Sequence, residues 1–563
     1  MKDKATMIPN ECSVIICGGG PCGLMLANEL GSRGISTVLI DDSPSTTSNA
    51  QASATQARTM EHYRRLGFAK EIRSLGLPAD YHTDVAYFTR FTGYELARFP
   101  LPASGESSKV TRKMLSGSWS AAELPHRISQ MWVEKVLLDH ALKYPSNSIH
   151  FNHELVSFSD GGDAITAQIQ DVRSGERKPI RAQYLVGTDG LNSLVRRSLG
   201  IEYVGEATAE RYFMGGRMLS IHLNSPQFYN VCPHDNAWMY VTINQDRRAY
   251  MIAVNGTGEF ELNTQLQDHE DETKITKADA LSMFQAAVGK PINAEILSFG
   301  AWETGRTLLA KRMHRGRAFL AGDSAHSFTP TGGMGYNTGI EDAVNLGWKL
   351  ATVIRGRAPE SLLSTYENER RPIAERNGNY ARQFADALGN TPAPPELETD
   401  TEEGAATRKK IGDYYNRQAR QEFDIPGVTF GYRYDDSPII CPDGTVPPPD
   451  VPNVYIPSAC PGGRAPHFWL GPEGSLYDEF GPEWTLLRCG ERPSEAIPLI
   501  RAAKAARLDL KILDLPFPEL RYIYEADFAL IRPDQIVAWR GNSCENVHGI
   551  ITTITGGTAT FLD

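Results

Sequence analysis

The pattern of apolar and polar residues near the start of the chain predicts a strand, a glycine-rich turn, a helix and a second strand. An apolar run over residues 13–17 ends at Gly18, residues 18–23 have the spacing G-x-G-x-x-G, and residues 24–32 continue with helical periodicity. A second apolar run, residues 37–40, ends at Asp41. Glycines permit the tight turn, the start of the helix favours a phosphate, and the carboxylate is suited to ribose hydroxyls. This order predicts a βαβ unit that binds a nucleotide through Gly18, Gly20, Gly23 and Asp41.

A second strand, turn and helix are predicted in the middle of the chain. Residues 317–321 are mostly apolar, Gly322 and Asp323 follow, and apolar residues then recur at helical spacing. Glycines let the backbone approach a ligand, and the N–H groups at a helix start favour negative charge. Asp323 is suited to accept hydrogen bonds from the hydroxyls of a sugar-like chain. Residues 322–343 are therefore predicted to form one wall of a cofactor site, with an ordinary turn capped by an acid as the alternative.

The remaining periodicity predicts an α/β chain with one antiparallel sheet. Helices are expected at residues 56–67, 131–141, 346–354 and 361–387, and strands at 149–158, 164–172 and 181–186. A hairpin with its turn at Thr92-Gly93 is expected within residues 82–98. Residues 212–302 alternate apolar and polar positions, as an antiparallel sheet does, and a helix at 277–288 interrupts them. Proline-rich and acidic stretches within 390–403 and 442–466 indicate linkers.

Composition narrows the possible functions. The 563 residues suffice for two or three domains, and the net charge of −11 with well-separated basic pairs argues against nucleic acid as a partner. Glycines interrupt the first apolar run, and no other run approaches membrane length, so no signal peptide or membrane span is expected. Eight cysteines occur without a C-x-x-C pair or a common zinc spacing. We therefore expect a cytoplasmic protein without a metal site.

Three motifs in this order resemble those of the group A flavoprotein monooxygenases, the FAD-dependent aromatic hydroxylases, and in particular their phenol-hydroxylase-like branch. The matching residues are Gly18, Gly20 and Gly23, then Asp189 and Gly190, and then Gly322 and Asp323. The resemblance extends over nearly the whole chain. Asp189 at the end of a strand is explained equally well, on its own, as a structural helix cap.

The resemblance implies an α/β fold in which a Rossmann-like FAD-binding domain of the p-hydroxybenzoate hydroxylase type carries an inserted antiparallel-sheet substrate domain. The FAD-binding domain would comprise residues 1–81, 126–204 and 302–390, and the substrate domain residues 82–125 and 205–301. Residues 391–454 would be a linker region, and residues 455–563 a thioredoxin-like C-terminal domain. Gly463 stands where a redox partner of Cys460 would be needed, so this last domain is expected to pack, and to support a homodimer, without disulfide exchange.

The resemblance also implies roles for individual residues. Asp41 would bind the adenosine ribose, Arg58 and Gln130 the phosphate and ribityl region of FAD, and Asp323 the ribityl chain, while Asp189 belongs to a motif used for both FAD and the nicotinamide cofactor. From the sequence alone, Arg58 is as well explained as a surface residue of its helix. The other residues expected at the cofactor are Gln51, Gly190, Pro330, Gly333, Gly335, Tyr336 and Asn337.

The activity that the resemblance implies is hydroxylation of a phenolic or other aromatic substrate. NAD(P)H would reduce FAD and leave, and O2 would form a C4a-hydroperoxyflavin whose distal oxygen goes to the ring. Ser53 stands where phenol-activating members commonly have Asp or His, and serine alone is a poor general base. Another group must deprotonate the substrate, or the substrate needs no such help. Candidates for the substrate pocket are Ser53, Arg217, His222, Trp238, Tyr240 and Pro330.

Three other functions remain open at this point. Oxygenation of a polycyclic or polyketide-like substrate, including epoxidation or Baeyer–Villiger insertion, would use the same flavin chemistry. A reductase of the same fold would act without oxygen, and a flavin-binding regulatory protein would show no turnover. Oxygen incorporation and ligand-stimulated NAD(P)H oxidation distinguish these functions.

Overall fold

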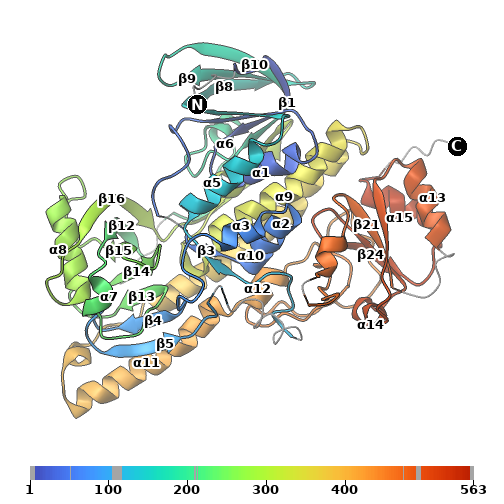
Figure 1. The fold of residues 1–563 in the computed structure, drawn as a ribbon. Coiled ribbons are helices and arrows are strands. Elements are labelled where there is room, and N and C mark those ends of the chain that lie inside the picture. Colours follow the sequence, from blue (N-terminus) through green and yellow to red (C-terminus); the bar gives the residue numbers. More distant parts are fainter. Residues whose placement is uncertain are drawn as a thin grey trace.

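The computed structural model describes residues 7–50, 52–103, 105, 117–207, 211, 213–472, 474–489 and 496–557. Three main sheets make up the molecule, and the helices α9 (Met334–Ile354) and α10 (Ser361–Gly389) run between them (Figure 1). The first sheet contains the N-terminal strands, the second is antiparallel, and the third lies in the C-terminal part of the chain.

The first sheet is largely parallel. Its strands in spatial order are β18 (His314–Arg315), β19 (Ala318–Leu320), β10 (Arg177–Gly187), β1 (Glu11–Cys17), β2 (Thr37–Asp41) and β7 (Asn147–Phe151). Cys17 is in register with Ile40 and with Gly187, and Gly187 with Leu320. The carboxyl ends of four parallel strands therefore meet at one edge, which is where ligands bind in such sheets.

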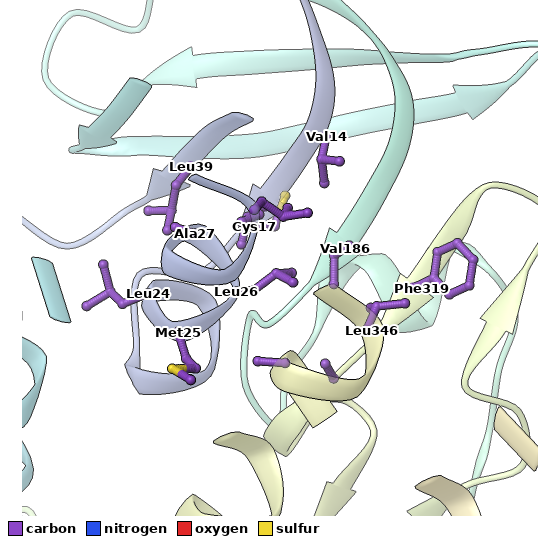
Figure 2. Packing of buried hydrophobic residues seen from close by; sticks show 14 of the residues in the cluster. Val14, Cys17, Leu24, Met25, Leu26, Ala27, Leu39, Val186, Phe319 and Leu346 are labelled. Carbon is purple, nitrogen blue, oxygen red and sulfur yellow. The ribbon is translucent and has the colours of Figure 1, made fainter. Parts of the chain in front are cut away.

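Both faces of this sheet are covered, which explains the continuous apolar runs of its strands. Val14, Ile15 and Ile16 are all fully buried, as expected for a central parallel strand that is covered on both faces. Figure 2 shows side chains of α1 (Pro21–Gly31), including Leu26, close to Val186 of β10 and Leu346 of α9. This core fixes the start of α1 and the start of α9 at the same edge of the sheet.

The second sheet confirms the antiparallel prediction. Its strands in spatial order are β16 (Glu295–Thr304), β12 (Gly216–Asn224), β15 (Glu259–Gln265), β14 (Ala249–Ala253), β13 (Met239–Thr242), β4 (Val85–Phe88) and β5 (Glu95–Phe99). Among the strands that the structure describes in this sheet, only β13 and β4 pair in parallel, while β4 and β5 form the expected hairpin. The predicted helix is α8 (Lys277–Val288), which begins with a capping box between Thr276 and Asp279.

The prediction of a linker over residues 391–454 is wrong for its central part. A helix of 22 residues, α11 (Glu402–Phe423), packs along β5, and Figure 1 shows it running beneath this edge of the sheet. Ile411, Tyr415 and Ala419 belong to the same apolar core as the sheet. Their spacing of four residues is a narrow apolar stripe in an otherwise charged segment, so the overall composition conceals the helix.

The C-terminal sheet has the order β22 (Leu510–Asp514), β21 (Trp484–Arg488), β23 (Phe528–Ile531) and β24 (Val537–Gly541). β21 and β22 are parallel, whereas β23 is antiparallel to both of its neighbours. The helices α13 (Ile497–Ala505), α14 (Glu519–Tyr524) and α15 (Val547–Ile554) accompany the sheet. Their assignment to a thioredoxin-like domain stays a prediction.

The strand expected at residues 149–158 is two strands. β7 ends at Phe151 and β8 (His153–Asp160) begins two residues later, because Asn152 has a left-handed backbone with φ of 59° that interrupts an extended chain. β8 then pairs with β9 (Ile165–Asp171), which pairs with β10.

The remaining elements are short or connect the three sheets. The helices are α2 (Ala57–Arg65), α3 (Ala69–Arg73), α5 (Gln130–Ala141), α6 (Leu194–Ser198), α7 (Phe228–Val231) and α12 (Pro426–Phe430), with 3-10 turns η2 (Gly322–Ser324), η3 (Thr331–Gly333), η4 (Pro395–Glu398) and η5 (Leu476–Glu479). The strands are β3 (Ala54–Thr55), β6 (His126–Arg127), β11 (Tyr203–Glu206), β17 (Thr307–Ala310) and β20 (His326–Ser327). Among the described residues, no helix is long and apolar enough to cross a membrane.

Candidate functional site

One large cavity joins the edge of the parallel sheet to the antiparallel sheet. Its volume is about 890 Å³, at the upper end of the range of about 300–1,000 Å³ typical of small-molecule sites. The residues predicted at a cofactor that line it are Gly20, Gln130, Gly190, Gly322, Asp323, Pro330, Gly333, Gly335 and Tyr336. On the opposite side, the antiparallel sheet contributes His222 and Trp238. The cavity therefore has a glycine-rich wall and a wall of larger side chains.

The G-x-G-x-x-G turn divides its glycines between packing and the cavity. A Cβ atom on Gly18, whose φ is 111°, would lie 2.2 Å from the carbonyl oxygen of Thr188, and one on Gly23 would lie 2.0 Å from the carbonyl oxygen of Gly18. By contrast, a Cβ atom on Gly20 would meet nothing within 4 Å. Gly18 and Gly23 thus hold the turn against β10, whereas Gly20 leaves space beside the start of α1 where a phosphate is favoured.

Two predicted carboxylates lie beside this turn without lining the cavity. Asp41 accepts hydrogen bonds from the backbone N–H groups of Gly19, at 2.6 Å, and Ser43, at 2.9 Å. Asp189 accepts one from the N–H of Val195 through Oδ2, while its buried Oδ1 has no partner among the described residues. Both residues shape the nucleotide end of the site, and their direct contact with a ligand stays a prediction.

Of the three predicted carboxylates, Asp323 is the one that lines the cavity. Its side chain accepts no hydrogen bond from the residues that the structure describes, although its backbone carbonyl accepts one from Tyr203. Asp323 is exposed to the cavity, yet the neighbouring protein desolvates its carboxyl group and so raises its pKa, with an opposing effect of His326 and a further increase from Asp342. A free acceptor at this depth fits the hydroxyl donors of a ribityl chain.

Asn337 is placed differently from the prediction, because it does not line the cavity. Its Oδ1 accepts hydrogen bonds from the N–H of Gln56 and the hydroxyl of Thr59, at 2.8 and 2.7 Å. Its Nδ2 donates to the carbonyls of Ala54 and Gly333, at 2.8 and 2.6 Å. The side chain of Asn337 thus makes all four of its hydrogen bonds within the protein. It links the turn at Gly333 to β3 and α2 on the side away from the cavity.

Arg58 also lies away from the cavity, contrary to the prediction. Its guanidinium is fully buried and donates to Glu61, to Oε1 of Gln535 at 2.6 Å, and to the carbonyl of Asp534 at 2.6 Å. The helix carrying it was predicted correctly, but Arg58 faces the C-terminal part of the chain. Gln51, another residue predicted at the cofactor, lies outside the described residues.

Two of the candidates for the substrate pocket lie elsewhere. Arg217 donates to the backbone carbonyls of Gln267 and Glu270 outside the cavity. Tyr240 is in the core of the sheet, where its hydroxyl accepts a hydrogen bond from the N–H of Ala237. The aromatic rings of Phe88, Phe91 and Phe228 cover Tyr240, and the alternation of residues along β13 does not predict these contacts.

Trp238, His222, Ser53 and Pro330 do line the cavity. The indole N–H of Trp238 and the hydroxyl of Ser53 are buried and have no hydrogen-bond partner among the described residues. The guanidinium of Arg127 lies 4.1 Å from the centre of the Trp238 indole ring system, a cation–π contact. Within the described part of the chain no base contacts the Ser53 hydroxyl, and the expectation that serine does not activate the substrate stays a prediction.

Two further buried carboxyl groups lie in the cavity wall and were not predicted from the sequence. Glu261 lies on β15, and Glu422 lies at the end of α11, where it accepts hydrogen bonds from the N–H of Gly332 and from Gln418. Burial raises the pKa of each to about 7. Polar residues at alternate positions 259, 261 and 263 of one strand are a signal that was available for Glu261, whereas Glu422 lay in the presumed linker.

Comparisons with known proteins agree with this geometry. Residues 11–380 match the FAD binding domain family. A putative polyketide hydroxylase of Streptomyces halstedii is 30% identical over 96% of this chain and 95% of its own length, and a phenol 2-monooxygenase of Pseudomonas sp. (strain EST1001) is 27% identical over 96% and 92%. The solved structure of the rebeccamycin biosynthetic enzyme RebC with reduced flavin is 32% identical, covers 98% of this chain and 100% of that one, and has a TM-score of 0.86.

These similarities confirm the predicted α/β fold of the p-hydroxybenzoate hydroxylase type and the predicted use of FAD, with NAD(P)H as co-substrate. The described residues contain no group of three His, Cys, Asp or Glu side chains arranged to hold a metal. The chain belongs to the FAD binding domain family, among its FAD-dependent aromatic monooxygenases.

Proposed function

We propose that this monooxygenase hydroxylates a phenolic substrate held between the flavin and the antiparallel sheet. The observation that carries the proposal is the single cavity, which extends from Gly20 past Asp323 to Trp238. A cofactor and an aromatic substrate that must react with each other need such a shared space.

FAD would lie along the glycine-rich wall. Its pyrophosphate fits the start of α1 beside Gly20, its ribityl hydroxyls fit Asp323, and its ring fits the surface formed by Pro330, Gly333 and Gly335. When bound, FAD takes a hydride from NAD(P)H and activates O2. The free N–H groups at the start of α9 favour negative charge beside the ring, and the buried walls exclude water.

The substrate would contact the opposite wall. The unpartnered indole N–H of Trp238 is suited to an acceptor on the substrate, since a buried donor without a partner costs free energy that a ligand can recover. His222, which is hydrogen-bonded to Glu259 at 2.7 Å, offers a second polar contact. Both side chains would position an oxygenated ring.

A screen of simple phenols, hydroxybenzoates and polycyclic phenols tests this function. Purified holoenzyme is assayed for ligand-stimulated NAD(P)H oxidation, with peroxide measured alongside hydroxylated product. We expect at least one phenol to accelerate NAD(P)H oxidation and to be hydroxylated. If FAD is bound stoichiometrically and every phenol leaves the rate unchanged, the proposal fails for these substrates.

A second candidate is oxygenation of a polycyclic, polyketide-like substrate. The 30% identity to a putative polyketide hydroxylase favours it. It predicts that polycyclic phenols have a higher kcat/KM than single-ring phenols in the same screen, whereas the reverse order would favour a simple phenol.

Further features of the proposal concern the C-terminal domain, the oligomeric state, the compartment and the domain bounds. Residues 455–563 would form a thioredoxin-like domain that supports a homodimer, and the enzyme would act in the cytoplasm without a nucleic-acid partner. The other domains would have the bounds given above, with α11 added to the substrate domain. Light scattering of the holoenzyme in solution tests the dimer directly.

A further inference from the structure

The cavity wall contains a buried carboxyl group, Glu261, that keeps one oxygen atom without a partner among the described residues. Glu261 is 8% exposed, and it lines the cavity on the sheet side. Its Oε1 accepts hydrogen bonds from the hydroxyl of Ser220 and from Nδ2 of Asn263, both at 3.1 Å. Its Oε2 accepts none from the described residues. One oxygen is thus held in place while the other is available to a ligand.

The support behind Glu261 is itself fixed. Asn263, which donates to Glu261, accepts a hydrogen bond from the indole N–H of Trp302 at 3.1 Å. Trp302 and Ser220 lie on the neighbouring strands β16 and β12, so three strands hold the carboxyl group in one orientation. A general base requires this kind of fixed geometry toward the proton that it takes.

We propose that Glu261 is the general base that takes the proton of the substrate's phenolic hydroxyl. This inference rests on the proposed hydroxylation of a phenol. The phenolic O–H bond breaks, its proton bonds to Oε2 of Glu261, and the electron pair remains on the phenolate oxygen. The extra electron density makes the ring more reactive toward an electrophilic oxygen. When the hydroxylated product forms, the proton returns from Glu261 to the phenolate oxygen, and the carboxylate of Glu261 is restored.

The environment of Glu261 adjusts it to this task. Burial raises its pKa to about 7, and this outweighs the opposing effects of the hydrogen bonds from Asn263 and Ser220 and of His222. The titratable groups on the same sheet near Glu261 are His222 on β12, Tyr250 on β14 and Glu259 on β15. Two further carboxyl groups of the cavity wall are Glu303 on β16 and Glu422 on α11. A base with a pKa near the working pH is both available in its ionised form and basic enough to act.

The first arm of the test compares pH profiles of the holoenzyme. In the wild type, kcat/KM for a phenol should fall as the pH drops below about 7, because the protonated carboxyl group cannot accept a proton. Glu261→Gln should lower kcat by about 10²–10⁴-fold and abolish this acidic limb, while flavin content stays the same. Glu261→Asp should restore part of the rate and the limb.

Two other variants identify the group responsible. Glu259→Gln changes a carboxylate on the same face of the same strand that does not line the cavity, and it should retain the acidic limb. Glu422→Gln changes the other buried carboxyl group of the cavity and should also retain it. Loss of the limb in Glu422→Gln but not in Glu261→Gln would overturn the assignment.

The second arm measures binding without turnover, through the change in flavin absorbance when a ligand binds. A phenol should bind about tenfold more weakly to Glu261→Gln, because a charged acceptor is replaced by a neutral one, while the methyl ether of the same phenol should bind equally to both proteins. Equal losses for phenol and ether would refute the assignment of Glu261. If the phenol, but not its methyl ether, binds more tightly to the wild type than to Glu261→Gln and yet no ligand is hydroxylated, the proposed function fails. The contact between Glu261 and the phenolic hydroxyl would still be supported.

Discussion

Replacing Asn337 with alanine tests how the glycine-rich wall is held in place. The side chain is 3% exposed and makes four hydrogen bonds, to Gln56, Thr59, Ala54 and Gly333, all between 2.6 and 2.8 Å. A net hydrogen bond contributes about 1 kcal/mol, and a buried group left without a partner costs about 1–3 kcal/mol. Because water can satisfy some of these groups, we expect a total loss of about 3 kcal/mol.

This loss should appear mainly in FAD binding. If binding has to restore the turn at Gly333, about 3 kcal/mol corresponds to roughly a 100-fold weaker Kd. Equilibrium titration of apoprotein with FAD and the temperature of flavin release, followed by flavin fluorescence, measure the effect. Saturating FAD should restore most of kcat, because Asn337 does not line the cavity.

Two variants serve as controls for this experiment. Asn337→Asp keeps both acceptor positions but loses both donors to the carbonyls of Ala54 and Gly333, and should give a partial loss. Asn390→Ala changes an exposed asparagine after α10 and should have little effect. A wild-type FAD Kd in Asn337→Ala would refute the idea that these four bonds hold the wall.

Three further predictions concern other parts of the site. Asp323→Ala should weaken FAD binding by about 10–100-fold through loss of a charged acceptor, and unchanged flavin content after dialysis would remove Asp323 from this role. Arg58→Ala should lower the melting temperature, since breaking a buried ion pair costs about 3–5 kcal/mol, yet leave the FAD Kd unchanged; a weaker Kd with an unchanged melting temperature would restore the role at the cofactor. The pKa of Glu422 is about 7 in the folded protein and ordinarily 4.5, so the folded state binds more protons between these two pH values. The stability of the wild type therefore falls as the pH rises through this window. Glu422→Gln should have a higher melting temperature than the wild type at pH 8 but not at pH 4. If the difference in melting temperature between Glu422→Gln and the wild type is the same at both pH values, this carboxyl group does not titrate as described.

The elements that the sequence predicted well are those set by local pattern. The βαβ unit follows from an unbroken apolar run, a glycine spacing and a helical period within residues 13–41, and none of these depends on distant contacts. The same holds for the hairpin at Thr92-Gly93, whose strands β4 and β5 pair as neighbours. The motif around Asp323 was also local, because its strand, turn and helix follow directly along the chain.

The direction in which a side chain points was harder to predict. Arg58 contacts Asp534, a residue 476 positions away, and no local pattern reveals that partner. Asn337 lies next to Tyr336, which does line the cavity, yet the helical turn of α9 directs it to β3 and α2. Motif membership identified the segment, and only packing determined which residue faces the ligand.

The residues that were missed share a different cause. Glu261 and Glu422 are both buried, and their burial depends on how the walls of the cavity come together. The alternating polar positions of β15 mark the face on which Glu261 lies but not its depth. Glu422 was further concealed because the charged composition of α11 predicts a solvated segment. Under our proposal, Glu261 on β15 would supply the general base that is missing at Ser53.

The fate of molecular oxygen tests the account most directly. Holoenzyme, NAD(P)H and a phenol found in the screen are incubated under isotopically labelled O2, and the product is analysed by mass spectrometry. We predict that each product molecule contains one labelled oxygen atom, in the new hydroxyl group on the ring. An unlabelled hydroxyl group derived from water, or a product formed equally well without O2, would contradict the assignment of this cavity to flavin-dependent hydroxylation.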